Sequence, residues 1–147
     1  MKIAVGCDPN AQSFKEEMIA YVQSLGHECF DFGSENPIYA EVAVKVATAV
    51  AAKEYDRGIL ICGTGIGMSI AANKVKGAYA ALVNEVFQAQ RAELSNHANI
   101  ITMGSQVTGI ETAKMMVKEY LANTFDEASR SMPKIQRIYD FEQEVMK

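Results

Sequence analysis

Short apolar runs alternate with longer amphipathic stretches along the whole chain. The apolar runs are bounded by turn-forming residues, which predicts strands at residues 2–6, 28–31, 57–62, 77–83 and 99–103. In the stretches between them apolar residues recur at intervals of three and four, which predicts helices. These are expected at residues 12–25, 39–52, 67–74, 85–94, 109–121 and 130–146, with Pro37 in the first turn of the second and Pro133 near the start of the last.

Strands that alternate with helices in this way form βαβ units, which build a parallel sheet covered by helices on both faces. The chain has 147 residues, which is enough for one domain with a sizeable core. We therefore expect a single three-layer α/β/α domain, Rossmann-like, over residues 1–147. Its sheet should have about five parallel strands, and a helix should end the chain.

Composition narrows the class of protein. Hydrophobic residues make up 49% of the chain and charged residues 22%, which is typical of a soluble globular protein. The net charge of −4 argues against a broad nucleic-acid interface, and no apolar run is long enough to span a membrane. The N-terminus lacks the features of a signal peptide. Three cysteines without a CxxC spacing argue against a zinc site or a disulfide framework and fit a reducing, cytoplasmic environment. We expect no cofactor.

Chemically active side chains follow several of the predicted strands. Ligands of open parallel sheets bind at the carboxyl ends of the strands. Cys7 and Asp8 follow the first predicted strand, and the sequence ILICGTGIGMSIAANK carries Cys62 into a glycine-rich loop and then a helix. Successive backbone N–H groups in such a loop can hold an anion or a developing negative charge.

Simpler interpretations of these features exist. A glycine-rich loop after a strand often only makes a tight turn, and the spacing fits neither a Walker loop nor the Rossmann fingerprint. Cys29 is expected to be a buried apolar residue of its strand, and Cys7 is ambiguous. Cys62 is better placed for reactivity, because a helix N-terminus favours the thiolate. His97, in the turn before the last predicted strand, could be functional or structural.

Four segments together resemble the ribose-5-phosphate isomerase B and galactose-6-phosphate isomerase family. They are residues 1–8, residues 55–74 with CGTGIGMSIAANK, the asparagine-rich turn before the last predicted strand, and the basic C-terminal tail. The resemblance implies a Rossmann-like fold and homodimers or tetramers with active sites shared between subunits. It also implies metal-independent aldose–ketose isomerisation of a sugar phosphate through a cis-enediol(ate). The tail, from about residue 125, would then pack on a partner subunit.

The resemblance also assigns roles. Cys62 would be the proton-transfer base, Thr64 would assist it, and Asp8 would hold a sugar hydroxyl or share in proton transfer. The oxyanion would be bound by the loop residues Gly63, Gly65, Ile66 and Gly67. Ser95, Asn96 and His97 would contact the substrate. Arg130 and Lys134 are four residues apart, so a helix would place both on one face, where they would bind the phosphate.

Several positions depart from the family pattern. Pro9 stands where a histidine usually follows the aspartate, and Asn36 replaces a tyrosine. Ser95 occupies the position of the ring-opening histidine, and Gln106 and Lys134 replace two arginines. Proton transfer is therefore expected to be retained, while ring opening and phosphate binding are altered.

Three functions follow from these observations. The leading one is a sugar-phosphate aldose–ketose isomerase whose substrate is a tetrose, pentose or hexose phosphate. The second is a non-catalytic subunit, a member of a heteromer, or a sugar-phosphate-binding protein of the same fold. The third, a flavodoxin-like nucleotide-binding module, is disfavoured because the glycine loop has no phosphate-binding lysine.

Overall fold

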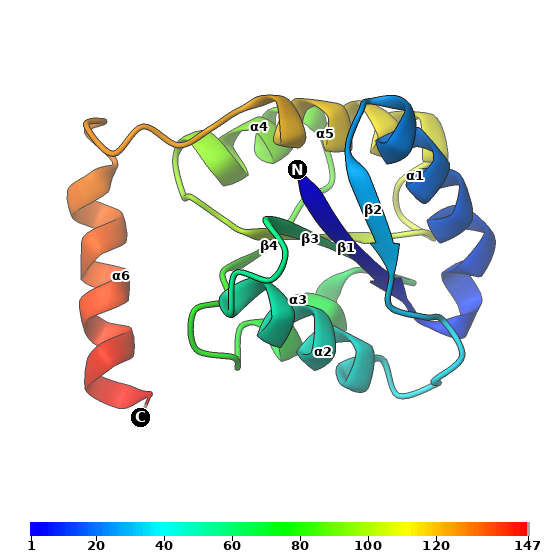
Figure 1. Cartoon of the computed structure of the whole chain (residues 1–147), viewed down its shortest axis with the longest axis horizontal. Coiled ribbons are helices and arrows are strands. Elements are labelled where there is room, and N and C mark those ends of the chain that lie inside the picture. Colours follow the sequence, from blue (N-terminus) through cyan, green and yellow to red (C-terminus); the bar gives the residue numbers. More distant parts are fainter. Residues whose placement is uncertain (147) are drawn as a thin grey trace.

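The computed structural model describes residues 1–146 and places them around one parallel five-stranded sheet with the spatial order β2-β1-β3-β5-β4 (Figure 1). The strands are β1 (Lys2–Cys7), β2 (Glu28–Asp31), β3 (Arg57–Cys62), β4 (Ala80–Leu82) and β5 (Ile100–Gly104). The helices are α1 (Gln12–Ser24), α2 (Tyr39–Ala51), α3 (Ile66–Ala72), α4 (Val86–Leu94), α5 (Ile110–Ala122) and α6 (Met132–Val145), with a short 3₁₀ helix at Pro9–Ala11. The predicted α/β/α fold is confirmed.

Alternate residues of the strands build two separate cores, one on each face of the sheet. Ile59 and Ile61 of β3 pack in the core covered by α1, α4 and α5, whereas Leu60 and Cys62 pack in the core under α2 and α3 (Figure 1). This follows from the two-residue period of a strand, whose successive side chains point to opposite faces. Cys7 belongs to the first core, so Cys7 and Cys62 lie on opposite faces of the sheet.

The register of the central strands brings their carboxyl ends level. Cys7 of β1 pairs with Ile61 of β3, and Cys62 pairs with Gly104 of β5. The loops that follow these three strands therefore meet at one edge of the sheet, as expected for a parallel α/β sheet.

Helix α2 begins at the predicted residue, but the predicted place of Pro37 in its first turn is wrong. Pro37 lies before the helix rather than in its first turn, and α2 begins at Tyr39. The side-chain Oδ1 of Asn36 accepts a hydrogen bond from the N–H of Ile38 at 2.9 Å. Such a turn holds the backbone outside the helix for two more residues.

The fourth predicted strand is shorter in the structure than expected, because its first residues make a turn instead of pairing. Gly77 has a φ of +85°, and the N–H of Ala78 bonds to the carbonyl of Val75. The N–H of Tyr79 bonds to the side chain of Asn99 at 2.8 Å. Only Ala80–Leu82 then pairs with β5.

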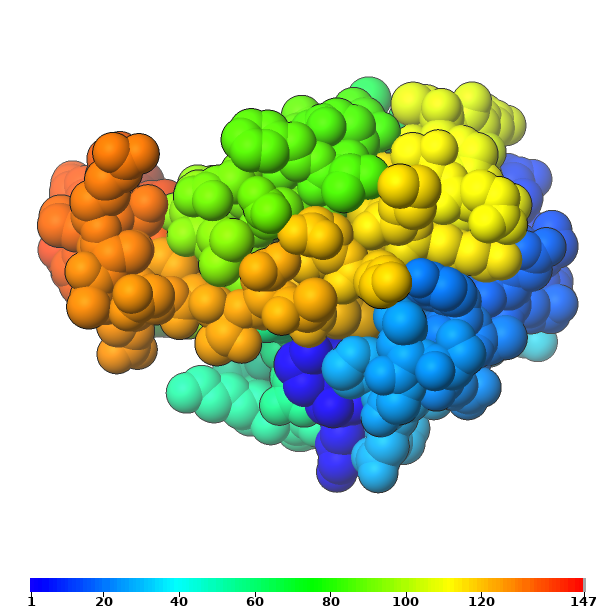
Figure 2. Space-filling model, turned by 90° about the horizontal axis from the view of Figure 1, so that it is seen from above, coloured from blue at the N-terminus to red at the C-terminus, as the bar shows by residue number. Residues whose placement is uncertain are grey.

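Helix α6 lies apart from the three layers, at one end of the molecule (Figures 1 and 2). It begins at Met132, two residues later than predicted, so Arg130 lies in a turn before the helix. Pro133 occupies the first turn of α6 and has no backbone N–H to donate to a carbonyl of the preceding turn, so the helix cannot continue toward Arg130 with regular hydrogen bonds. The prediction that Arg130 and Lys134 share one face of a helix is wrong for this reason.

Candidate active site

Cys62 ends β3 and opens the glycine-rich loop that leads into α3. Its Sγ atom accepts a hydrogen bond from the backbone N–H of Gly65 at 3.1 Å, a donor that suits a thiolate. Gly65 has a φ of +79°, and a Cβ atom there would lie 2.8 Å from the backbone carbon of Met103. Only glycine allows both this backbone conformation and this close approach, so Gly65 aims its N–H at the sulfur.

The loop after β5 fixes the glycine-rich loop from the side. The N–H of Ser105 donates to the carbonyl of Cys62 at 2.8 Å, and the N–H of Gln106 donates to the carbonyl of Gly63 at 3.0 Å. The side-chain amide of Gln106 also lies against Gly63. Gln106 therefore brings a neutral amide, rather than the arginine of the family pattern, to the edge of this loop.

Further groups of the loop remain available at its exposed side. Thr64 is exposed, and its hydroxyl accepts a hydrogen bond from the N–H of Ile66 at 3.3 Å. Among residues 1–146 the N–H groups of Thr64 and Gly67 have no acceptor. Backbone donors of this kind, beside a sulfur, can stabilise an oxygen that becomes negative during a reaction.

Asp8 follows β1 and lies next to the end of β3. Its N–H donates to the carbonyl of Ile61 at 3.2 Å, and its Oδ1 accepts from the N–H of Asn10 at 3.1 Å. The second bond caps the short helix at Pro9–Ala11 and orients the carboxylate. The structure thus brings Asp8 to the same edge of the sheet as Cys62 and Thr64.

Cys7, the other cysteine near this edge, is unsuited to be a base. Its side chain is buried in the core under α1, and burial raises the pKa of its thiol to about 11. Burial likewise raises the pKa of the Cys29 thiol to about 11. Both thiols are therefore protonated near neutral pH.

Tyr39, which the sequence interpretation did not single out, also lies at this edge. A Cβ atom on Gly67 would lie 2.5 Å from the ring of Tyr39, so the aromatic ring covers the start of α3. Tyr39 is the first residue of α2 and is partly exposed. An aromatic residue at the start of a helix, after a loop that reaches the carboxyl edge of the sheet, is the signal that could have identified it.

The remaining predicted site residues lie at the opposite edge of the sheet. Ser95, Asn96 and His97 precede β5, whereas Cys62 ends β3 alongside the last residue of β5. The hydroxyl of Ser95 accepts a hydrogen bond from Nε of Arg91 at 2.6 Å. One chain therefore does not bring Ser95, Asn96 and His97 to Cys62.

Helix α6 of the C-terminal tail lies beside the turn that carries Ser95 and Asn96. Asn96 and Ile135 of α6 line the same small hollow, of about 260 Å³. Arg130 and Lys134 are exposed, and among the described residues neither makes an ion pair. The amino edge of the sheet thus carries a second group of candidate residues, separate from Cys62.

Comparison with known proteins places the chain in a family. The family model described as Ribose/Galactose Isomerase matches residues 3–138. A "Ribose-5-P isomerase B" of Listeria innocua is 42% identical, covering 97% of this chain and 98% of that protein. A "D-erythrulose-4-phosphate isomerase" of Pectobacterium atrosepticum is 41% identical, covering 97% and 95%. The chain belongs to the ribose/galactose isomerase family.

Comparison with solved structures supports the same family. The structure of Clostridium thermocellum ribose-5-phosphate isomerase B superposes with a TM-score of 0.91 at 37% identity, covering 98% of this chain and 99% of that one. The predicted family and the predicted class of enzyme, a sugar-phosphate isomerase, are therefore confirmed. None of the helices within residues 1–146 combines the length and the apolar character that crossing a membrane requires.

Proposed function

We propose that this protein interconverts the aldose and ketose forms of a short sugar phosphate, with Cys62 as the base. The contact between the Gly65 N–H and Cys62 Sγ, at 3.1 Å, is the observation that carries the proposal. It combines a sulfur at the carboxyl edge of the sheet with a loop of backbone donors. These are the two groups that proton transfer next to a carbonyl needs.

The reaction moves one proton between two neighbouring carbons of the substrate. The Cys62 thiolate removes the proton from the carbon next to the carbonyl, and the electron pair of that C–H bond forms the carbon–carbon double bond of a cis-enediolate. The former carbonyl oxygen becomes negative, and N–H groups of residues 63–67 stabilise it. The thiol then returns the proton to the other carbon. These steps use groups of the protein and need no metal.

Asp8 and Thr64 take part beside the sulfur in this proposal. The carboxylate of Asp8 is oriented by the N–H of Asn10, at 3.1 Å, and it accepts a hydrogen bond from a substrate hydroxyl. Proton exchange between the two substrate oxygens completes the isomerisation, and the hydroxyl of Thr64 is placed to assist there. Asp8 would thus fix which carbon faces Cys62.

The residues at the amino edge reach the reaction only from a second chain. β5 has five residues, so its first and last Cα atoms lie about 13 Å apart at the usual rise of a strand. We propose that Ser95, Asn96, Arg130 and Lys134 of one copy complete the site around Cys62 of another, in a homodimer or tetramer. Exposed apolar side chains at both edges support this arrangement: Ile66 and Ile70 on α3, and Ile138 and Phe141 on α6.

The proposed substrate is a tetrose 4-phosphate. A closed sugar ring hides the carbonyl, and a serine hydroxyl such as that of Ser95 donates a proton far less readily near pH 7 than imidazole does. A tetrose 4-phosphate forms no stable ring, because the phosphate blocks the hydroxyl that would close it. The relative named for D-erythrulose 4-phosphate acts on a sugar phosphate of this length.

A kinetic comparison of phosphorylated sugars tests the proposal. The purified chain alone should turn over D-erythrulose 4-phosphate much faster than ribose 5-phosphate or a hexose 6-phosphate. The Ser95→His variant should raise the rate with ribose 5-phosphate and leave the tetrose rate within about twofold. Efficient turnover of ribose 5-phosphate by the unmodified chain would contradict the choice of substrate. Activity only with a second, different chain would indicate a heteromer, and binding without turnover would indicate a binding protein.

A further inference from the structure

Polar contacts at the amino edge of the sheet help to attach helix α6 to the rest of the chain. Glu142 is 9% exposed, and its carboxylate accepts hydrogen bonds from the N–H of Gly77 at 2.8 Å and from the Tyr79 hydroxyl at 2.7 Å. The ring of Tyr139 packs on that of Tyr79, with centroids 5.1 Å apart. These contacts are directional, so they set the orientation of the helix as well as its distance.

His97 adopts a backbone conformation that is unusual for its residue type. Its φ is +49°, and it follows the end of α4 at a position where glycine or asparagine is common. The N–H of the next residue, Ala98, donates to the carbonyl of Ala92 at 2.8 Å and closes the helix. A non-glycine residue in this conformation is strained, and contacts of its side chain can offset the strain.

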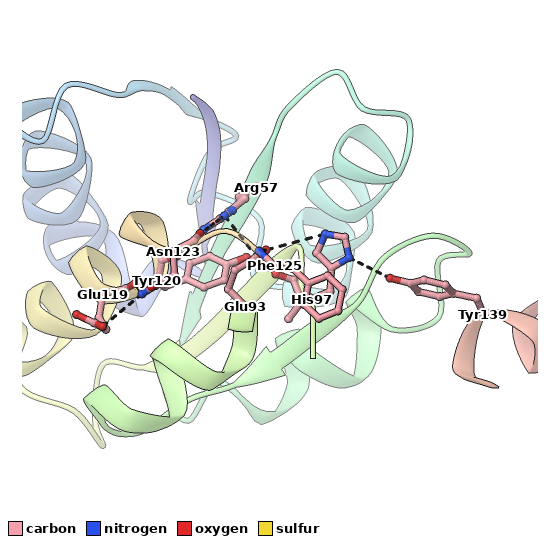
Figure 3. Close-up of polar contacts among 9 residues, drawn as sticks. Arg57, Glu93, His97, Glu119, Tyr120, Asn123, Phe125 and Tyr139 are labelled. Carbon is pink, nitrogen blue, oxygen red and sulfur yellow. Dashed lines mark hydrogen bonds and ion pairs between the residues drawn. The ribbon is translucent and has the colours of Figure 1, made fainter. Parts of the chain in front are cut away.

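The side chain of His97 makes such contacts on three sides (Figure 3). Its Nδ1 lies 3.2 Å from the hydroxyl of Tyr139, and its ring stacks on Phe125 with centroids 4.7 Å apart. Its Nε2 lies 3.9 Å from a carboxylate oxygen of Glu93. Nδ1 is therefore within hydrogen-bond distance of the Tyr139 hydroxyl, whereas Nε2 lies too far from Glu93 for a hydrogen bond and faces that carboxylate at longer range.

The groups beneath His97 are themselves fixed. Glu93 is 3% exposed, lies 3.6 Å from the guanidinium of Arg57 and accepts a hydrogen bond from the N–H of Phe125 at 2.9 Å. Arg57 in turn donates to the carbonyl oxygens of Tyr120 and Asn123 (Figure 3). His97 thus rests on a buried ion pair that also holds the first residues after α5.

We infer that His97 is a positioning residue, which through Tyr139 joins the turn carrying Ser95 and Asn96 to the tail carrying Arg130 and Lys134. This inference rests on the proposed function, because it concerns how the two elements are presented together to Cys62 of another copy. Ser95 and Asn96 immediately precede His97 in the chain, and Lys134 lies on the same helix as Tyr139. The contact between His97 and Tyr139 therefore links the two elements directly, in addition to the contacts of Glu142 and Tyr79 that hold α6.

Substitutions on each side of the contact test this role. Tyr139→Phe removes only the hydroxyl, and His97→Asn removes the ring while keeping a residue that tolerates the backbone conformation. Each should raise the KM for D-erythrulose 4-phosphate about three- to tenfold and change kcat by less than about twofold, as expected for one lost hydrogen bond that orients a binding group. Tyr21→Phe, on α1, is the matched control and should change neither constant.

A double-mutant cycle separates positioning from a general loss of stability. In a Lys134→Ala background the effect of Tyr139→Phe on KM should largely disappear, because the group being positioned is absent. Additive effects on KM, or a fall in kcat with KM unchanged, would overturn the inference.

Hydrogen exchange provides a measurement that does not depend on activity. Backbone amide exchange in α6 should rise in both Tyr139→Phe and His97→Asn and stay unchanged in Tyr21→Phe. Unchanged exchange in α6 would show that the contact does not hold the tail, and would overturn the inference. If the unmodified chain turned over none of the sugar phosphates, the proposed function would fail, and the exchange result would still decide whether His97 holds the tail.

Discussion

The N–H of Gly65 lies 3.1 Å from Sγ of Cys62, and this contact joins the end of β3 to the loop before α3. Cys62 is 5% exposed in the isolated chain, so the sulfur lies at the base of the site rather than on its rim. The thiol and the donors that face it come from one short segment. Their relative geometry is therefore determined within a single chain, whereas the phosphate-binding groups proposed above, Arg130 and Lys134, lie away from Cys62 in that chain.

Replacing Cys62, the proposed base, should greatly reduce turnover and leave the fold intact. Cys62→Ser should lower kcat at least about 100-fold, because a hydroxyl is a far weaker base than a thiolate near neutral pH. Steady-state kinetics with D-erythrulose 4-phosphate measure this loss. Cys29→Ser, in the edge strand β2, is the matched control and should keep nearly full activity. An active Cys62→Ser variant would remove Cys62 from the mechanism.

The two exposed cations of the tail should act on binding rather than on chemistry. Arg130→Ala and Lys134→Ala should each raise the KM for a phosphorylated sugar, since each removes a charge-assisted contact of about 1.5–3 kcal/mol. The measurement is KM and kcat with D-erythrulose 4-phosphate. Lys118→Ala removes an exposed lysine of α5 and should leave both constants unchanged. A loss confined to kcat would speak against phosphate binding by these residues.

A side chain at Gly65 should disrupt the loop. Gly65→Ala should destabilise the protein by at least about 1–3 kcal/mol, because the new Cβ meets the backbone of Met103 and the left-handed conformation disfavours it. Urea unfolding followed by circular dichroism measures the change. Gly109→Ala is the control, since a Cβ there has no heavy atom within 4 Å. Equal stabilities of the two variants would show that the loop adapts to a side chain.

The ion pair between Lys15 and Asp31 should make stability depend on pH. Burial alone would raise the pKa of the Asp31 carboxyl, but hydrogen bonds from Lys15 at 2.7 Å and from the N–H of Gly33 at 2.8 Å outweigh it, and the pKa is lowered. The stabilisation is therefore present above the unfolded pKa of about 4 and is lost as the pH falls through the lower folded value.

Asp31→Asn tests this dependence. It removes the negative charge beside the buried Lys15 while keeping an oxygen that can accept its hydrogen bond, and because Asp31 is half-exposed it should destabilise the protein by about 1 kcal/mol at pH 7. The difference from the unmodified protein should shrink as the pH falls below about 4. Urea unfolding at pH 7, 4 and 3 measures it, with the exposed Asp140→Asn as control. A difference that stays constant with pH would contradict the assignment.

The local pattern of apolar and polar residues was sufficient to predict most of the strands and helices. It was also sufficient to predict the part of the candidate site that lies at the carboxyl edge of the sheet. The continuous apolar run of β3 predicts a strand buried on both faces, and the glycines after Cys62 predict a loop that opens a helix. Asp8 and Cys62 could be placed together because parallel strands end at one edge. These properties depend on residues close together in the chain, so they can be recognised without knowing what packs against them.

Long-range packing decided the rest. The sequence does not show that β5 lies between β3 and β4, that the Tyr39 ring covers Gly67, or that Tyr139 reaches His97. Each of these contacts joins segments that are far apart in the sequence. The local periodicity of hydrophobic residues does not reveal which distant segments pack together. Local sequence pattern was therefore enough to predict the parallel α/β fold and the thiol at the start of the glycine-rich loop. The tertiary structure was needed to show that Cys62 lies away from Ser95 and the tail. Cys62 pairs with the last residue of β5, whereas Ser95 precedes the first residue of that strand, so the length of β5 separates them.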